Sequence, residues 1–411
     1  MKRIDTHVVR SRPLEGPLGG QLGPFTRSLQ EQGYARSTIH RRVLLVAGFS
    51  RWLNQRGIGL QSVTTTHTSR YLRARARQVQ LVHGDAAALR HLLDFLHETG
   101  VLPTEKAARR PLPAVERWAQ AYAAYLADAR GLVHGTVVQY VPFIRQFLQD
   151  RFGDGPVRLA HLSGRDVGRF VQRQARHLQP KRAKLLTTAL RSFLEYARSQ
   201  GATARALAAA VPTVANWSMA TIPRAIAPEQ VRQLLASIDR RTAIGRRNYA
   251  IVLTLARLGL RAGEVAALEL DDIDWHGGQL RVRRKGGGQS TLPVPADVGR
   301  AIAAYLRRGR PVSASRRVFV RARAPLRGFQ GASGVGSVVR HALQGTGIDA
   351  PTKGTHQFRH GLASTMLRHG ASLGEIGDVL GHRHPWTTMI YTKVDLTALR
   401  ALAVPWPGGG R

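Results

Sequence analysis

The sequence contains no cysteine, few acidic residues and no long apolar run. The absence of cysteine excludes disulfide bonds and thiolate-ligated metal sites. No run of about 18 or more apolar residues is present, so no segment is predicted to span a bilayer. The first residues, Met1 to His7, include basic side chains, but no apolar stretch follows them, so a secretory signal peptide is not predicted. A cytoplasmic protein is therefore expected.

Basic residues, in contrast, are abundant. The chain has 62 Lys and Arg residues against 25 Asp and Glu, a formal net charge of +37 and a pI of about 11.8. In a compact fold such an excess repels itself unless a polyanion neutralises it. Nucleic acid meets this need, because each neutralised phosphate releases condensed counterions. Arginine-rich codon usage in a GC-rich genome is the alternative explanation. The composition favours a nucleoid-associated DNA-binding protein without a membrane partner.

The length of 411 residues and the hydrophobic content of 43% predict two or three globular domains. Residues 1–24 are rich in Gly, Pro and Arg, which is typical of a flexible arm. Pro212, Pro223 and Pro228, in a stretch without helical periodicity, predict a linker at 209–227. The expected parts are the arm at 1–24, helical modules at 25–105 and 112–208, the linker at 209–227, a C-terminal domain at 228–404 and a disordered tail at 405–411.

The two helical modules share an order of residues. The offset between matching positions grows from 98 to 101, as short loop insertions would produce. A duplicated module is therefore predicted, although any two helical bundles have leucine-rich faces in common. The matching positions are Thr38 and Thr136, Phe49 and Phe147, Tyr71 and Phe170, Leu89-Arg90 and Leu190-Arg191, and Gly100 and Gly201.

The C-terminal domain is mainly helical with one change of period. Asn248 to Leu260 is a strongly apolar helix. From Leu280 to Val294, alternating residues flank a glycine-rich turn, which predicts a β-hairpin. Helices follow from Pro351, with a break at Gly370, and a last short helix is expected at Asp395–Ala403. The fold class is therefore mainly α with a small β-sheet or hairpin.

Five short polar segments interrupt this domain, and their residues suit phosphodiester chemistry. Cleavage without a metal needs cations on the phosphate oxygens, a nucleophile and an acid for the leaving oxygen. Arg261 and Arg359 can hold the phosphate, because the guanidinium stays charged and binds bidentately. Lys285, on the glycine-rich turn, can donate a proton, with a plain phosphate contact as the alternative. Tyr391 is the candidate nucleophile.

Two histidines lie four residues apart on the helix that carries Arg359. His356 can move protons near neutral pH. For His360 a packing or hydrogen-bonding role is favoured over catalysis. The i, i+4 pair also resembles a zinc-binding helix, but the glutamate that acts there as base is missing, so no metal is predicted.

The ordered set resembles the tyrosine recombinase (phage integrase) family, whose pattern is Arg, Lys, His-x-x-Arg, His or Trp, and Tyr. Arginine and lysine are 24 residues apart, and histidine and tyrosine nine. The acidic residue of Leu260-Arg261-Ala262-Gly263-Glu264 matches a supporting position of the family. The matching residues are Arg261, Glu264, Lys285, His356, Arg359, His382 and Tyr391.

The resemblance implies a role for each residue. Tyr391 attacks the scissile phosphate and forms a 3′-phosphotyrosyl link, while Arg261, Arg359 and His382 stabilise the transition state. Lys285 protonates the leaving 5′-oxygen, and His356 assists proton transfer at the tyrosine. The linkage conserves bond energy, so no cofactor is expected, and no phosphate-binding loop of the NTPase type is present.

The resemblance also implies double-stranded DNA as partner, a tetramer on two sites and a Holliday junction. The second module is similar to the family's SAM-like core-binding domain. The first module is a departure, and it suggests a mobile-element recombinase working with sibling recombinases. Alternatives are a type IB topoisomerase, which relaxes DNA without exchange, and a degenerate DNA-binding relative. Phosphate contacts are expected from Arg36, Arg41, Arg42, Lys181, Arg182, Lys184, Arg283 and Arg284.

Overall fold

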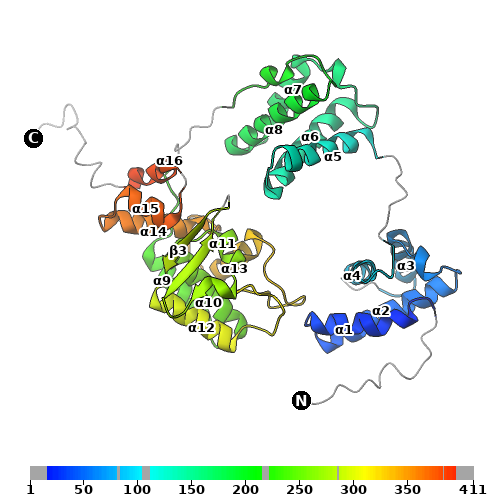
Figure 1. The fold of residues 1–411 in the computed structure, drawn as a ribbon, viewed down its shortest axis with the longest axis horizontal. Helices are drawn as coiled ribbons and strands as arrows, with labels where there is room; N and C mark the ends of the chain where they lie inside the picture. Colours follow the sequence, from blue (N-terminus) through cyan, green and yellow to red (C-terminus); the bar gives the residue numbers. More distant parts are fainter. Residues whose placement is uncertain are drawn as a thin grey trace, which may run out of the picture. The chain divides into compact units, whose positions relative to one another are not determined.

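The structure is a computed structural model, shown in Figure 1, and it describes residues 16–80, 84–103, 112–214, 222–284, 287–382 and 384–394. Lys285, the helix expected at Asp395–Ala403 and the tail at 405–411 lie outside these residues. The described chain has a hydrophobic core in each helical module, and a large and a small one in the C-terminal domain. No described helix is long and apolar enough to cross a membrane.

The first module is a small helical bundle. Its core gathers apolar side chains that recur at three- and four-residue steps, such as Phe49 and Leu53, both fully buried. The short helix η3 (Leu60–Ser62) separates its second and third α-helices. The α-helices are α1 (Leu22–Glu31), α2 (Arg36–Asn54), α3 (Thr65–Ala76) and α4 (Asp85–Glu98).

The arm predicted for residues 1–24 ends earlier than expected. The helix η2 (Gly19–Gln21) and the start of α1 lie within it, and Leu18 and Leu22 are buried in the core of the first module. Pro24 does not prevent this, because the first four N–H groups of a helix have no partner within the helix. The prediction of an irregular segment was therefore wrong for residues 18–24, and residues 1–15 lie outside the described chain.

The second module has four α-helices with a three-residue helix between the second and the third, as the first module does. A helix of 11 residues is followed by one of 19, a three-residue helix, one of 12 and a long last helix. In the first module the second, third and fourth of these also have 19, three and 12 residues. The elements are α5 (Ala114–Ala124), η4 (Tyr125–Ala129), α6 (His134–Phe152), η5 (Leu159–His161), α7 (Gly164–Ala175), α8 (Pro180–Ser199) and η6 (Leu207–Ala210).

Side chains at matching positions make the same contacts between helices in both modules. The rings of Phe49 and Tyr71 join α2 to α3 with centroids 5.2 Å apart. Phe147 and Phe170, at the matching positions, join α6 to α7 at 5.1 Å. The last helix of each module is followed by a glycine of positive φ, Gly100 or Gly201. These shared contacts support the proposed duplication more strongly than leucine-rich faces alone.

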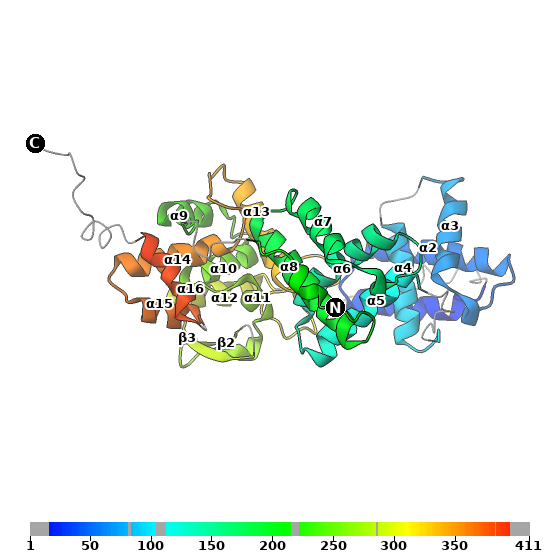
Figure 2. The ribbon, with the colours of Figure 1, turned by 90° about the horizontal axis from the view of Figure 1, so that it is seen from above.

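The C-terminal domain consists of helices and a small sheet at one side of them (Figure 2). The apolar helix predicted from Asn248 is α10, and it starts earlier, at Ala243, because Thr242 caps it by accepting from the N–H of Gly245. The sheet gains a strand that the sequence did not reveal, since β1 has only two residues. Its helices are α9 (Pro228–Ser237), α10 (Ala243–Leu258), α11 (Ala262–Ala267), η7 (Leu270–Asp272), α12 (Ala296–Arg308), α13 (Ala332–Gln344), α14 (His356–Arg368), α15 (Leu373–Leu380), α16 (Pro385–Thr388) and η8 (Met389–Val394).

The sheet is antiparallel, in the order β1-β2-β3. β1 (Ile273–Asp274) pairs with β2 (Gln279–Arg283), and β2 pairs with β3 (Gln289–Pro293), so that Leu280 faces Leu292 across the hairpin. Both leucines are buried against the helices, and the alternation predicted from the sequence is the burial pattern of β2. In Figure 2 the hairpin lies along one side of the domain.

A second, smaller core stabilises the end of the domain. It consists of Ala363 from α14, Ile376 and Leu380 from α15, and Tyr391 from η8. The three helices α14, α15 and α16 lie together in Figures 1 and 2. The segments that carry His382 and Tyr391 are thus held by a cluster separate from the main core.

Candidate active site

Arg261 is positioned by the turn that ends α10. Gly259 makes this turn with φ +58°, and a Cβ there would lie 2.7 Å from Cδ2 of Leu380. Arg261 is the N-cap residue of α11. Its backbone N–H donates to Oε2 of Glu264 and its Nη1 donates to Oε1, both at 2.8 Å. One carboxylate therefore binds both the backbone and the guanidinium of Arg261.

Arg359 connects the two halves of the site. Its side chain is 4% exposed, and its Nη1 donates to the carbonyl oxygen of Gly259 at 2.8 Å. Its Nη2 donates to the carbonyl oxygen of Leu380, the last residue of α15. Burial, followed by the charge of Arg261, lowers the pKa of Arg359 to about 10, so the guanidinium is still charged at neutral pH. The turn that carries Arg261 and the segment that carries His382 therefore meet at one cation.

Arg284, just after the end of β2, is buried and bonded to Glu264, the partner of Arg261. Its guanidinium donates to Glu264 (3.3 Å), to the hydroxyl of Ser290 on β3 (2.7 Å) and to the carbonyl oxygen of Val379 (3.2 Å). Its side chain is 8% exposed, and burial lowers its pKa. Gly381 makes room for it, since a Cβ there would lie 2.6 Å from Nε of Arg284. Arg284 thus joins the hairpin to the end of α15.

His382 is held as a neutral ring. Its Nδ1 lies 2.7 Å from the hydroxyl of Thr388, which is 2% exposed. Burial is the main cause that lowers the pKa of His382 to about 4, and the nearby arginines Arg359 and Arg261 add to it. When the hydroxyl of Thr388 donates to Nδ1, the proton of the ring stays on Nε2, where it can be donated to a phosphate oxygen.

Tyr391 is enclosed, and its hydroxyl contacts His360, for which the sequence favoured a packing or hydrogen-bonding role. The phenol oxygen lies 3.0 Å from Nδ1 of His360, and Tyr391 is only 1% exposed. Burial raises the pKa of the phenol, while the charges of Arg359 and Arg261 lower it. Burial, His356 and Arg359 lower the pKa of His360, so a neutral ring is available to accept the phenolic proton.

A basic hollow of about 810 Å³ opens beside Arg261, Glu264 and Arg284. Glu264 is the one carboxylate among its described lining residues, and it is already bonded to Arg261 and Arg284. His356, at the first position of α14, is exposed to this hollow. Two of its cations, Arg340 on α13 and Lys353, were not predicted from the sequence, because neither stands in a recognisable motif. The cationic lining consists of Arg261, Arg283, Arg284, Arg340, Lys353 and His356.

The basic residues predicted to contact DNA differ in their surroundings. Arg283 is bonded to Glu269 (2.8 Å) and to Asp272 (3.2 Å), and Arg284 is buried as described above. In the first module Arg36 and Arg41 are exposed, whereas Arg42 lies 2.9 Å from Nδ1 of His91 and stacks over Tyr34. At the start of α8 the exposed residues are Lys181, Arg182 and Lys184.

Comparison with known proteins places the site in a family. Residues 224–397 match the model of the phage integrase family. The chain is 57% identical to the putative integrase/recombinase y4rA of Sinorhizobium fredii over 98% of both chains. It is 30% identical to the tyrosine recombinase XerD of Mycobacterium tuberculosis, over 70% of this chain and 96% of that protein.

Solved structures agree on the fold. The XerH site-specific recombinase bound to its palindromic difH substrate has a TM-score of 0.56 at 17% identity, covering 70% of this chain and 84% of that one. A lambda integrase dimer bound to a COC′ core site has a TM-score of 0.53 at 14% identity, covering 80% of this chain and 91% of that one.

The fold and the site define a tyrosine recombinase, an enzyme that cleaves and rejoins DNA. The chain belongs to the phage integrase family. The comparisons give no support to the topoisomerase or to the degenerate DNA-binding protein considered from the sequence.

Proposed function

We propose that this chain recombines DNA at specific sites through a 3′-phosphotyrosyl intermediate on Tyr391, for a mobile element or phage in the bacterial cytoplasm. The phenol oxygen of Tyr391 attacks the scissile phosphorus, and the bond from phosphorus to the 5′-oxygen breaks. The phenolic proton leaves to a histidine, and the 5′-oxygen takes a proton from Lys285. The reverse attack by a 5′-hydroxyl of another strand restores the phosphodiester and the tyrosine.

The arginines carry the charge stabilisation in this proposal. Arg261 faces the basic hollow, where the non-bridging phosphate oxygens would bind. Arg359 contributes its charge from a buried position. Its hydrogen bonds to the carbonyl oxygens of Gly259 and Leu380 keep the two segments of the site together. Neutral His382 adds a hydrogen bond from Nε2. Donors already in place cost no reorganisation when charge develops on the phosphate.

The observation that carries the proposal is the bridge made by Arg359. It donates to the turn before Arg261 and to the residue before Gly381-His382, and its charge also acts on Tyr391. Residues that are 130 positions apart, from Arg261 to Tyr391, therefore belong to one electrostatic unit. Because Tyr391 is 1% exposed, DNA binding must also open the small core that encloses it.

Covalent capture tests the nucleophile. Nicked suicide duplexes with a randomised centre are incubated with the protein, and the covalently captured strands are sequenced. We expect capture at a defined sequence, with the adduct on Tyr391. Tyr391→Phe should bind the selected duplex with unchanged affinity and form no adduct, whereas Tyr249→Phe, at a tyrosine outside the site, should behave as the wild type. A phosphotyrosyl adduct in Tyr391→Phe would exclude this residue as nucleophile.

The acid role of Lys285 has its own test, since this residue lies outside the described chain. Lys285→Ala should cleave an ordinary suicide duplex slowly. It should recover on a duplex with sulfur in the 5′-bridging position, because a thiolate leaves without a proton. Equal defects on both duplexes would exclude Lys285 as the acid.

The same proposal includes assembly on DNA. Two pairs of subunits, either four copies of this chain or copies mixed with sibling recombinases, would hold two duplexes while strands are exchanged through a Holliday junction. Crosslinking on the captured duplex, with and without a tagged sibling protein, distinguishes the two compositions.

A further inference from the structure

The first module carries a row of exposed arginines on one helix. Arg70, Arg73 and Arg77 follow each other at i, i+3 and i+7 on α3 and its C-cap, so they share one face of the helix. All three are exposed, whereas Tyr71 and Thr68 on the opposite side are buried. We call these three residues the α3 arginine row.

The surroundings of this row are short of negative charge. The described part of the module has few carboxylates, and none of them lies within 4 Å of a guanidinium of the row. Nε of Arg73 donates a hydrogen bond to the carbonyl oxygen of Ser69, at 3.4 Å. The acidic residues of the described part are Glu31, Asp85, Asp94 and Glu98. The basic ones are Arg27, Arg36, Arg41, Arg42, Arg51, Arg56, Arg70, Arg73, Arg75, Arg77 and Arg90.

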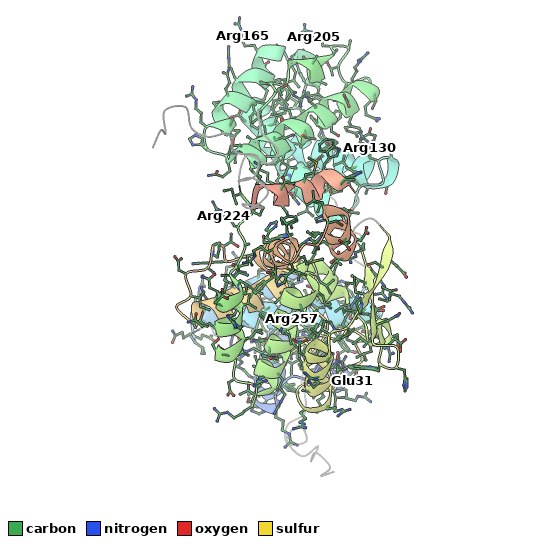
Figure 3. The ribbon with its side chains drawn as sticks, turned by 90° about the vertical axis from the view of Figure 1, so that its left-hand side faces the viewer. Glu31, Arg130, Arg165, Arg205, Arg224 and Arg257 are labelled. Carbon is green, nitrogen blue, oxygen red and sulfur yellow. The ribbon has the colours of Figure 1, made fainter. Side chains whose placement is uncertain are left out.

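The second module repeats the row at an offset of 99 residues. Arg70 corresponds to Arg169 and Arg77 to Arg176 on and after α7, and both of these are exposed. In place of Arg73 the second module has glutamine, but it gains Arg165 one turn earlier, which lies on the surface of its module in Figure 3. In contrast, Arg173, which lies next to this row, is paired with Asp150. The second module thus has exposed arginines at the positions that match Arg70 and Arg77.

We propose that the α3 arginine row makes the first module a second binding module for duplex DNA, which contacts the phosphate backbone without reading bases. Seven residues of helix span about 10 Å, and one DNA strand presents a phosphate about every 3.4 Å along its axis, so the row can reach successive phosphates. Arginine binds these oxygens bidentately.

A protein partner fits this face less well. Interfaces between proteins are built around buried aromatic or aliphatic anchors. The exposed positions of α3 are Thr65, Thr66, Ser69, Arg70, Arg73 and Ala76, which include no such anchor. The inference rests on duplex DNA being the substrate, as proposed above.

The test compares two triple variants of the full chain that lose the same charge. One is Arg70→Gln, Arg73→Gln, Arg77→Gln. The matched control is Arg232→Gln, Arg241→Gln, Arg316→Gln, because each of these arginines is exposed and already paired with a carboxylate. Affinity for a fluorescein-labelled, mixed-sequence duplex is measured by anisotropy over a range of salt concentrations, and the midpoint of thermal unfolding is measured for both variants.

For the row variant we expect about tenfold or more weaker binding at low salt and a slope of log affinity against log salt that is smaller by about 2.7, from three lost phosphate contacts. The control should change far less. Row and control variants with equal slopes and affinities would overturn the proposal. So would a row variant that is altered only in its self-association. Because the row includes none of the active-site residues, covalent capture of the selected suicide duplex should persist at saturating protein. A failure of capture in the wild type would instead count against the proposed function.

Discussion

The phenol oxygen of Tyr391 lies 3.0 Å from Nδ1 of His360, and the two rings meet edge to face with centroids 5.7 Å apart. His360 is the second histidine of the His-Gln-Phe-Arg-His segment, not the one that the family pattern includes. Its ring centroid is 6.4 Å from that of His356. In this geometry His360 is the group that can accept the phenolic proton directly. His356, which lines the hollow, could take part only in a later proton transfer. The proton role of His356 remains a prediction.

Replacing His360 by alanine should slow covalent capture of a suicide duplex by about 10- to 100-fold, because Tyr391 loses the acceptor that orients its hydroxyl. The affinity for DNA should not change. His360→Asn should recover part of the rate, since its amide oxygen can accept from the phenol near the position of Nδ1.

The pH profile separates this role from a purely structural one. The pKa of His360 is lowered, so its accepting, neutral form is present above that value and is lost only as the pH falls through it. The wild-type rate should therefore fall on the acid side, and His360→Ala should lack this step. His276→Ala, at an exposed turn, is the control. A wild-type rate in His360→Ala would exclude any role for the bond.

Thr388→Val should slow capture about tenfold without weakening DNA binding. The change removes the hydroxyl 2.7 Å from Nδ1 of His382 while keeping the shape of the side chain. Thr388 is 2% exposed, so water does not replace the lost partner, and the ring is no longer held in the tautomer that donates from Nε2. Thr392→Val is the matched control, because that hydroxyl donates to the carbonyl oxygen of Met389. Similar rates in both variants would contradict the prediction.

The order of the catalytic residues was readable from the sequence because it depends on residue type and spacing. The hairpin was readable from its alternation, and α10 from its apolar residues. The contact between His360 and Tyr391 was not, since the sequence separates these residues by 31 positions and only the small core around Ala363 and Leu380 brings them together. In the same way, adjacent Arg283 and Arg284 look equivalent in the chain, but residues on a strand and at its end point in different directions.

Lowering the pH should destabilise the C-terminal domain in part through His382. Its pKa is about 4 in the folded protein and about 6.5 when unfolded, so the unfolded chain binds more protons between these values. The contribution is complete above about pH 6.5 and is lost as the pH falls toward 4; at pH 5 the loss is about 2 kcal/mol. Urea unfolding at about pH 7 and about pH 5 should therefore show a smaller difference for His382→Gln than for the wild type. Equal differences would mean that the ring is not held neutral.

Arg284→Met and Arg283→Met should differ in stability although the residues are neighbours. Arg284 is 8% exposed, and its removal leaves the hydroxyl of Ser290 and the carbonyl oxygen of Val379 without this donor inside the domain, so we expect a loss of about 3 kcal/mol. The side chain of Arg283 is 42% exposed, and its ion pairs with Glu269 and Asp272 should contribute about 1 kcal/mol or less. Urea unfolding of the two variants measures both values. Arg284 also donates to the end of α15, just before His382, so Arg284→Met should slow covalent capture as well. Arg283→Met should instead lower the affinity for DNA and its salt dependence, if Arg283 leaves its carboxylates to bind a phosphate. Equal stability losses would show that the burial of Arg284 does not distinguish it from its neighbour.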